Sequence, residues 1–256
     1  MVDTLEFPAG AAIVVGGSGG VGRAIVDRIA RAGSDVVVTY RRNADAAEAA
    51  GEVVRSYGRS AEVMRVSLED ESEVASMIER AITKFGGIHT VVDAAGADIP
   101  MRFIGEIDQA TWRTVIDGDV HGFFVLVRAS LPHLRKAKGS IVAITSAGLR
   151  RYPTRDVLSV APKAAIEAIV RAVACEEGRY GVRANSVALG VIDAGIFHRL
   201  KETELADEWL EAAKKNTPLH RFGTAEEVAE VVAFLASSRA SYVTGQSLAV
   251  DGGYSA

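Results

Sequence analysis

A glycine-rich segment is the first part of the sequence whose residue types suggest chemistry. Residues 16–22 read Gly-Gly-Ser-Gly-Gly-Val-Gly and lie between an apolar stretch and a helical one. A strand that turns directly into a helix leaves backbone N–H groups free at the helix N-terminus. There the helix dipole attracts a pyrophosphate, and glycine lets the backbone approach it closely. We therefore predict a dinucleotide-binding turn. Its candidate contacts are Gly16, Ser18, Gly20, Val21 and Gly22.

A pair of arginines indicates which dinucleotide binds. NAD-binding folds usually place an acidic residue about 20 residues past the glycine turn, where it binds the ribose 2′-hydroxyl. Here residues 39–43 read Thr-Tyr-Arg-Arg-Asn and carry no carboxylate. A guanidinium of Arg41 or Arg42 would instead pair with a 2′-phosphate, so the sequence favours NADP(H) over NAD(H). The alternative is that both arginines are solvated charges at the start of the next helix.

Short β-branched runs alternate with longer helical stretches, and these elements must position the turn. The run 35–39 holds three consecutive valines and is typical of a buried parallel strand. Seven strands alternating with helices predict one α/β domain over residues 1–256, a Rossmann-type, doubly wound, seven-stranded parallel sheet flanked by helices. The expected strands are 11–15, 35–39, 61–66, 89–94, 140–145, 183–188 and 246–250. The expected helices are 21–32, 44–57, 70–85, 108–135 with or without an interruption, 160–177 and 224–237.

Two helices carry end signals, and one region departs from the alternation. The first helix is followed by Gly33, a C-terminal cap, and the last opens with Thr224 and has Glu227 three residues later, the spacing of a capping box.

The polar region 190–222 follows a strand end and contains a helical stretch near 202–215. We expect it to be a mobile segment that covers the substrate.

Composition restricts the class of partner and the compartment. The chain carries 29 basic and 33 acidic side chains, a net charge of −4, and no basic run, so nucleic acid is not an expected partner. Cys175 is the only cysteine, so an internal disulfide is impossible and a reducing, cytoplasmic compartment fits. Residues 1–6 do not read as a signal peptide, and no apolar run approaches the ~20 residues that span a membrane. We expect a cytoplasmic protein with a small-molecule substrate.

Several ordered motifs make the chain similar to a known family. Residues 93–96 read Asp-Ala-Ala-Gly, residues 139–142 read Gly-Ser-Ile-Val ahead of Ser146, and residues 218–223 read Pro-Leu-His-Arg-Phe-Gly. Residues 242–246 read Tyr-Val-Thr-Gly-Gln and lead to a Val-Asp-Gly-Gly end. With the glycine turn, these segments resemble the short-chain dehydrogenase/reductase family, in particular its 3-oxoacyl-[acyl-carrier-protein] reductase-like members. The resemblance covers essentially the whole chain and implies a nicotinamide-dependent fold that assembles as a homotetramer or homodimer.

The catalytic set that the resemblance implies is present only in part. Family members reduce a carbonyl with a hydride from the nicotinamide and a proton from a tyrosine. A lysine four residues later lowers the pKa of that tyrosine and holds the ribose, a serine binds the carbonyl oxygen, and an asparagine feeds a proton relay. Ser146 fits the serine and Lys163 the lysine, but Ser159 stands at the tyrosine position and Asp119 at the asparagine position. The resemblance also implies cofactor contacts at Asp93, Ala94, Gly96, Lys163 and Ile192.

Serine cannot simply replace the tyrosine as an acid. A phenol has a pKa of about 10, an aliphatic hydroxyl is far less acidic, and proton transfer by a positioned group typically contributes ~10²–10⁴-fold to the rate. Three alternative donors are Tyr152 in the preceding loop, Asp156 seven residues before Lys163, and Asp119 if burial raises its pKa. The simpler interpretations are a surface aromatic for Tyr152, a helix N-cap for Asp156 or Ser159, and a hydrogen-bonded or solvated carboxylate for Asp119.

Other kinds of site are not expected. The five histidines are scattered without the spacing of metal ligands. No G-x-S-x-G elbow surrounds Ser146, which excludes the usual hydrolase arrangement. Phe123, Phe124, Val127 and Leu131 recur on one helix, and we interpret them as core or subunit contacts.

The sequence leaves two functions open. The first is an NADP(H)-dependent oxidoreductase acting on a carbonyl or alcohol, whose acid is a bound water, a substrate group or one of the alternative donors. The second is a dehydrogenase-fold protein without redox chemistry, either a regulatory or structural subunit or a lyase or hydratase. Loss of both the tyrosine and the asparagine motivates this second hypothesis. Nothing in residues 190–222 identifies the substrate.

Overall fold

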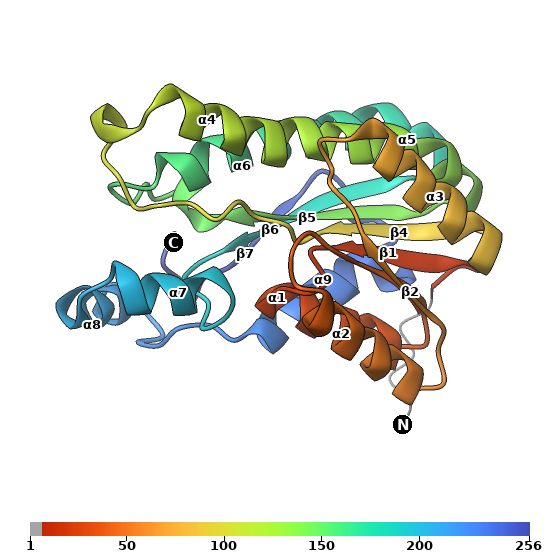
Figure 1. The fold of residues 1–256 in the computed structure, drawn as a ribbon, viewed down its shortest axis with the longest axis horizontal. Helices are drawn as coiled ribbons and strands as arrows, with labels where there is room; N and C mark the ends of the chain where they lie inside the picture. The colour runs from red at the N-terminus through yellow and green to blue at the C-terminus, as the bar shows by residue number, and fades with distance from the viewer. Residues whose placement is uncertain (1–6) are drawn as a thin grey trace.

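A parallel sheet of seven strands forms the centre of the molecule. The computed structural model describes residues 7–256, so the expectation about a signal peptide at residues 1–6 lies outside the described residues. The strand order is β3-β2-β1-β4-β5-β6-β7, which confirms the doubly wound fold (Figure 1). The strands are β1 (Ala11–Val15), β2 (Asp35–Tyr40), β3 (Ala61–Arg65), β4 (Ile88–Asp93), β5 (Ser140–Ser146), β6 (Arg183–Leu189) and β7 (Ser247–Val250).

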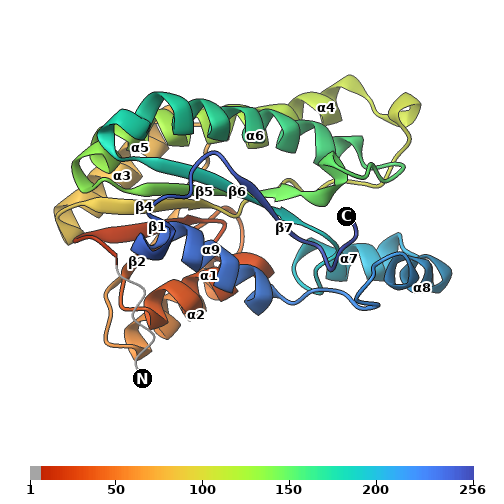
Figure 2. The ribbon, with the colours of Figure 1, turned by 180° about the vertical axis from the view of Figure 1, so that it is seen from behind.

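Helices cover both faces of the sheet, as Figures 1 and 2 show. One layer consists of α1 (Gly20–Arg31), α2 (Ala44–Ser56) and α9 (Ala225–Ala236), and the other of α3 (Glu71–Phe85), α5 (Gly122–Ala137) and α6 (Val157–Glu177). Successive side chains of a strand point to opposite faces, so Ile13 packs into one core and Val14 into the other. Both are fully buried, which is why the strands read as continuous apolar runs.

The helical region expected over 108–135 is interrupted. Asp108 caps α4 (Gln109–Val115) by accepting a hydrogen bond from the N–H of Thr111 at 2.7 Å. A π-helical turn (Ile116–His121) then joins α4 to α5. Such a turn is wider than an α-helical one and is frequent at functional sites. In α5, Phe123 and Val127 belong to the core, as interpreted from the sequence.

The region 190–222 holds two helices: the second matches most of the helical stretch expected near 202–215, and the first was not expected. These are α7 (Ile196–Thr203) and α8 (Asp207–Lys215), which lie beyond the carboxyl ends of the strands (Figure 1). The N–H groups of Glu204 and Leu205 both donate to the carbonyl oxygen of Leu200, which closes α7. The carboxylate of Glu204 contacts the loop after β4, where it accepts a hydrogen bond from the N–H of Met101.

The helix ends follow the signals in the sequence. Gly33 has a φ of 100° just after α1, a left-handed conformation that favours glycine. Thr224 and Glu227 form the expected capping box at the start of α9. Within residues 7–256, no helix has the length and apolar character needed to cross a lipid bilayer.

Candidate active site

The glycine turn lies at the carboxyl end of β1, and close backbone contacts require its glycines. Gly16 has a φ of 73°, and a Cβ there would lie 2.9 Å from the carbonyl oxygen of Ala94. A Cβ on Gly22 would overlap the carbonyl oxygen of Gly16, and one on Gly20 would lie 2.5 Å from the backbone nitrogen of Gly195. No larger residue fits these three positions without a backbone shift, so the turn stays tight.

The first turn of α1 fits a dinucleotide's pyrophosphate. Gly19 occupies the N-cap position, no side chain caps the helix, and the first turn contains no acidic residue. Of the other residues expected to contact the phosphates, Val21 lies in this turn and Ser18 lies just before the N-cap, and both are half-buried. The N–H groups and the positive end of the helix dipole therefore remain available to an anion.

The two arginines after β2 differ in their contacts. The Arg41 guanidinium lies 3.0 Å from a carboxylate oxygen of Glu69, and the two side chains are 54% and 36% exposed. Arg42 is exposed and makes no hydrogen bond or ion pair with any of residues 7–256. An exposed ion pair contributes about 0–1 kcal/mol, so a phosphate can compete with Glu69 for Arg41. Sequence reasoning missed Glu69 because the contact joins two distant segments.

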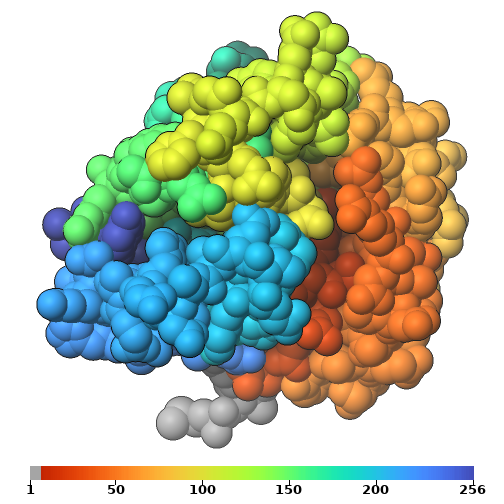
Figure 3. Space-filling model, turned by 60° about the vertical axis from the view of Figure 1, so that its left-hand side comes forward, coloured from red at the N-terminus to blue at the C-terminus, as the bar shows by residue number. Residues whose placement is uncertain are grey.

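A crevice opens where the strand order reverses, between the carboxyl ends of β1 and β4. Figure 3 shows a hollow there, with the red N-terminal residues at its floor between the yellow, orange and blue parts of the chain. Ala94 follows β4, donates its N–H to the carbonyl oxygen of Val15 at 3.0 Å, and is half-buried, whereas Gly96 is exposed. In open parallel sheets, ligands bind at such a switch point.

Lys163 reaches this crevice from α6. Its ammonium donates a hydrogen bond to the carbonyl oxygen of Ala95 at 3.2 Å and lies 3.2 Å from a carboxylate oxygen of Asp119. The Lys163 side chain is 11% exposed and that of Asp119 is 9% exposed, so the ion pair is buried. The π-helical turn carries Asp119 into this position. The structure thus brings together two residues that lie 44 positions apart in the sequence.

A second carboxylate, Asp93, lies close enough to the same ammonium to interact with its charge. Asp93 ends β4, is 3% exposed, and accepts a hydrogen bond from the N–H of Ala95 at 3.1 Å. Burial raises the pKa of Asp93 to about 6, although the positive charge of Lys163 opposes the shift. The nearby carboxylate of Asp119 acts in the same direction as burial. One cation and two acids therefore share the edge of the crevice.

Ser146 ends β5, and its hydroxyl oxygen accepts a hydrogen bond from the N–H of Gly148 at 3.1 Å. A Cβ added to Gly148 would lie 3.0 Å from that oxygen, 2.8 Å from the Val160 side chain and 3.1 Å from that of Pro153. Ser146 is therefore packed beside the first turns of α6 through the small Gly148.

The helix that carries Lys163 starts earlier than expected, at Val157 instead of residue 160. Ser159 is thus the third residue of α6 and not its N-cap, which corrects that interpretation. Ser159 lies one turn before Lys163 on the same helix face. Tyr152 is 58% exposed, consistent with the surface aromatic expected from the sequence.

Asp156 occupies the N-cap position of α6, but its side chain makes no capping hydrogen bond. Only its backbone carbonyl accepts, from the N–H groups of Ser159 and Val160. The carboxyl group has no hydrogen bond or ion pair with residues 7–256, and burial raises its pKa to about 7. Asp156, Ser159 and Lys163 follow the i, i+3, i+7 spacing of one helix face.

The segment 190–222 is tied to the crevice at its beginning. Ile192 is buried and forms an isolated parallel bridge with Gly223, and the N–H of Asp193 donates to the carbonyl oxygen of Gly223 at 2.8 Å. The next residues bring the backbone of Gly195 against Gly20 in the glycine turn. The segment is therefore closed against the turn at this point.

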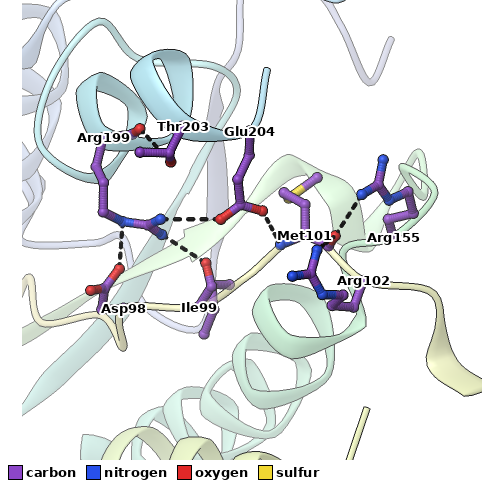
Figure 4. A network of polar contacts seen from close by, with 8 residues as sticks. All are labelled: Asp98, Ile99, Met101, Arg102, Arg155, Arg199, Thr203 and Glu204. Atoms are coloured by element: carbon purple, nitrogen blue, oxygen red, sulfur yellow. Dashed lines mark hydrogen bonds and ion pairs between the residues drawn. The ribbon is translucent and has the colours of Figure 1, made fainter. Parts of the chain in front are cut away.

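A polar network connects α7 to the loop after β4 (Figure 4). Arg199 pairs with Asp98 at 2.7 Å, donates to the carbonyl oxygen of Ile99 at 2.9 Å, and pairs with Glu204 at 3.1 Å. Glu204 in turn accepts a hydrogen bond from the N–H of Met101 at 2.9 Å. Sequence reasoning missed these residues because no local pattern predicts a contact across 100 positions.

Known proteins of similar sequence and structure cover nearly the whole chain. Residues 15–255 match the family model described as enoyl-(acyl carrier protein) reductase. The 3-oxoacyl-[acyl-carrier-protein] reductase of Staphylococcus epidermidis is 33% identical over 243 residues, 94% of this chain and 97% of its own. The cis-4-hydroxycyclohexanecarboxylate dehydrogenase of Sinomonas cyclohexanicum is 35% identical over 254 residues, 98% of each chain. A solved structure of a variant Serratia marcescens short-chain dehydrogenase/reductase has a TM-score of 0.89 at 28% identity, covering 98% of this chain and 99% of that one.

Proposed function

Because the chain belongs to the short-chain dehydrogenase/reductase family, we propose that it is an NADP(H)-dependent oxidoreductase with an atypical catalytic set, acting on a carbonyl or alcohol substrate. The observation that carries this proposal is that the glycine turn and Lys163 both contact the loop after β4, at the same crevice. The backbone of Ala94 contacts the glycine turn at Gly16, and the next carbonyl, that of Ala95, accepts the hydrogen bond of Lys163.

The cofactor-holding residues are proposed from these contacts. The glycine turn takes the pyrophosphate at the start of α1, and the third N–H of the Lys163 ammonium, beyond the two that Asp119 and the carbonyl of Ala95 accept, would bind the nicotinamide ribose. The residues proposed to contact the cofactor are Gly16, Ser18, Gly20, Val21, Gly22, Arg41, Arg42, Asp93, Ala94, Gly96, Lys163 and Ile192. When bound, the cofactor would supply or accept the hydride.

The preference for NADP(H) depends on the arginines after β2. Arg42 is exposed and unpaired within residues 7–256, and Arg41 is held only by an exposed ion pair with Glu69. A guanidinium recognises a phosphate through paired N–H groups, which a ribose hydroxyl cannot match. No carboxylate in residues 39–43 would accept a hydrogen bond from a ribose 2′-hydroxyl.

The proton is proposed to pass through Asp156, with Ser146 holding the substrate oxygen. Ser159 occupies the position expected for a tyrosine, and its hydroxyl is too weak an acid to replace a phenol. A general acid or base works best when its pKa lies near the working pH, and burial raises the pKa of Asp156 to about 7. Among the alternative donors, Asp119 is committed to the ion pair with Lys163, and Tyr152 is largely exposed.

A second candidate function is a dehydrogenase-fold protein without redox chemistry. The observation that favours it is the buried ion pair, since Asp119 and the carbonyl of Ala95 already bind the Lys163 ammonium. A lysine so engaged has only one N–H left for a ribose, fewer than an unpaired ammonium would offer.

We also propose that α7 and α8 cover the substrate. The family resemblance further implies that the protein forms a homotetramer or homodimer.

The test is a turnover assay in both directions. Purified protein is mixed with NADPH and a panel of ketones and acyl thioesters, and with NADP⁺ and a panel of alcohols. We expect turnover in the wild type, a ~10²-fold loss of kcat in Asp156→Asn, and a change below about threefold in Ser159→Ala. No turnover on any substrate, together with strong reductase activity in Ser159→Tyr, would overturn the proposal in favour of the non-redox protein.

A further inference from the structure

Three charged groups form a compact cluster at the edge of the crevice. The ammonium of Lys163 lies 3.2 Å from a carboxylate oxygen of Asp119 and donates to the carbonyl oxygen of Ala95 at 3.2 Å. The N–H of Ala95 donates to the carboxylate of Asp93 at 3.1 Å. The backbone of Ala95 therefore binds both Lys163, through its carbonyl, and Asp93, through its N–H. All three side chains are almost fully buried.

The charges of this cluster do not cancel. Lys163 supplies one positive charge, and Asp93 and Asp119 supply two negative ones. Neither acid forms an ion pair with any other cation among residues 7–256. Burial raises the pKa of Asp93 to about 6, so above pH 7 this carboxyl is mostly ionised. At neutral pH and above, the cluster therefore carries one net negative charge, which solvent screens only weakly because the groups are buried.

The crevice beside the cluster is the proposed place of the nicotinamide cofactor. Asp93 ends β4 at the point where the strand order reverses, and the glycine turn begins directly after β1 on the other side. The oxidised and reduced forms of the cofactor differ by one positive charge on the nicotinamide ring and share the same phosphates. A net charge in the protein at this end of the crevice therefore acts on the difference between the two forms.

Resting on the proposed function, we propose that the Asp93–Asp119–Lys163 cluster makes the protein bind the oxidised cofactor more tightly than the reduced one, and so makes the bound reduced cofactor a stronger hydride donor to a carbonyl substrate. In that direction the reduced cofactor would give a hydride, with its two electrons, to the carbonyl carbon, and the carbonyl oxygen would take a proton from the carboxyl group that we assign to Asp156. The substrate becomes an alcohol, and the cofactor is left in its oxidised form. The Asp156 carboxylate then regains a proton from water.

The size of the effect follows from ordinary charge–charge interactions. An opposite charge within about 4–6 Å of an ionisable group typically shifts its equilibrium by one to three pKa units, which is at least tenfold. At the somewhat larger separations within a cofactor site, we expect each carboxylate of the cluster to change the ratio of the two dissociation constants by about tenfold.

The experiment measures binding and not turnover. Isothermal titration calorimetry at pH 8 gives the dissociation constants of NADP⁺ and NADPH for the wild type, Asp119→Asn, Asp93→Asn and Asp117→Asn. Asp117 lies two residues before Asp119 in the same π-helical turn but is exposed, so its variant loses the same charge outside the crevice. Circular dichroism establishes that each variant is folded, and the conservative Asp93→Asn provides a second test if Asp119→Asn is unstable.

We expect the wild type to bind NADP⁺ more tightly than NADPH. In Asp119→Asn and Asp93→Asn, the ratio should move about tenfold toward NADPH, whereas Asp117→Asn should leave it within about twofold. Equal ratios in Asp119→Asn and Asp117→Asn, or a wild-type preference for NADPH, would overturn the charge inference and leave the proposed function standing. Failure of the wild type to bind either form would overturn the proposed function and the inference with it.

Discussion

Replacing Asp93 with asparagine should stabilise the protein at alkaline pH. Burial raises the pKa of Asp93 to about 6, whereas an aspartate in an unfolded chain has a pKa of about 3.9. Two pKa units correspond to about 3 kcal/mol, because each unit is worth 1.36 kcal/mol. Asparagine keeps the shape and the oxygen that accepts from the N–H of Ala95, but it cannot ionise.

The sign of the effect depends on pH. Below pH 4 the carboxyl is protonated in both the folded and the unfolded chain, so the substitution should change little. Between pH 4 and 6 the unfolded chain releases its proton first, and the wild type loses stability relative to Asp93→Asn. Above pH 6 the difference reaches its full value of about 3 kcal/mol, which for a chain of this size raises Tm by roughly 6–12 °C.

Urea denaturation followed by circular dichroism at pH 4.5 and pH 8 measures this difference. The exposed Asp117→Asn is the matched control and should change the free energy of unfolding by less than about 0.5 kcal/mol at both pH values. A gain in Asp93→Asn of the same size at both pH values, or a loss at pH 8, would refute the assignment of Asp93 as a costly buried charge.

Three further substitutions test separate parts of the structure. Gly22→Ala should abolish cofactor binding and lower Tm, because its Cβ overlaps the carbonyl of Gly16; retention of wild-type affinity in a titration would exclude the tight turn. Lys163→Met should lower the free energy of unfolding at pH 8 by about 3–5 kcal/mol, since it leaves Asp119 unpaired in a buried site, and a second Asp119→Asn change should restore part of this loss in urea denaturation. Arg199→Met breaks the network between α7 and the loop after β4 and should speed hydrogen exchange in α7 alone; unchanged protection there would show that the network does not hold the segment.

Most of the fold could be predicted because its determinants are local. The apolar runs of β1 and β2 alternate with amphipathic helices, the glycine turn follows the first strand, and Thr224 with Glu227 marks the start of α9. These signals depend on residues within a few positions of one another. The strand order then follows from the rules of parallel sheets and from the family resemblance.

The features that could not be predicted depend on long-range contacts. The end of α7 is set where Glu204 accepts a hydrogen bond from the backbone of Met101, a hundred residues away. The sequence suggested that the Asp156 side chain caps a helix, yet it makes no capping hydrogen bond. Its carboxyl group is instead buried by the folded chain around it, and this burial cannot be read from neighbouring residues. Similarly, the pairing of Lys163 with Asp119 arises only when the π-helical turn and α6 pack together.

An equilibrium fluorescence titration of the wild-type protein with NADPH, NADP⁺, NADH and NAD⁺ tests the central claim most directly. The account predicts that both 2′-phosphorylated cofactors bind, each at least about tenfold more tightly than its counterpart without the phosphate, as expected for guanidinium recognition of a phosphate. Equal or tighter binding of NADH and NAD⁺ would contradict the role of Arg41 and Arg42. Absence of binding by all four would contradict the assignment of the crevice as a cofactor site.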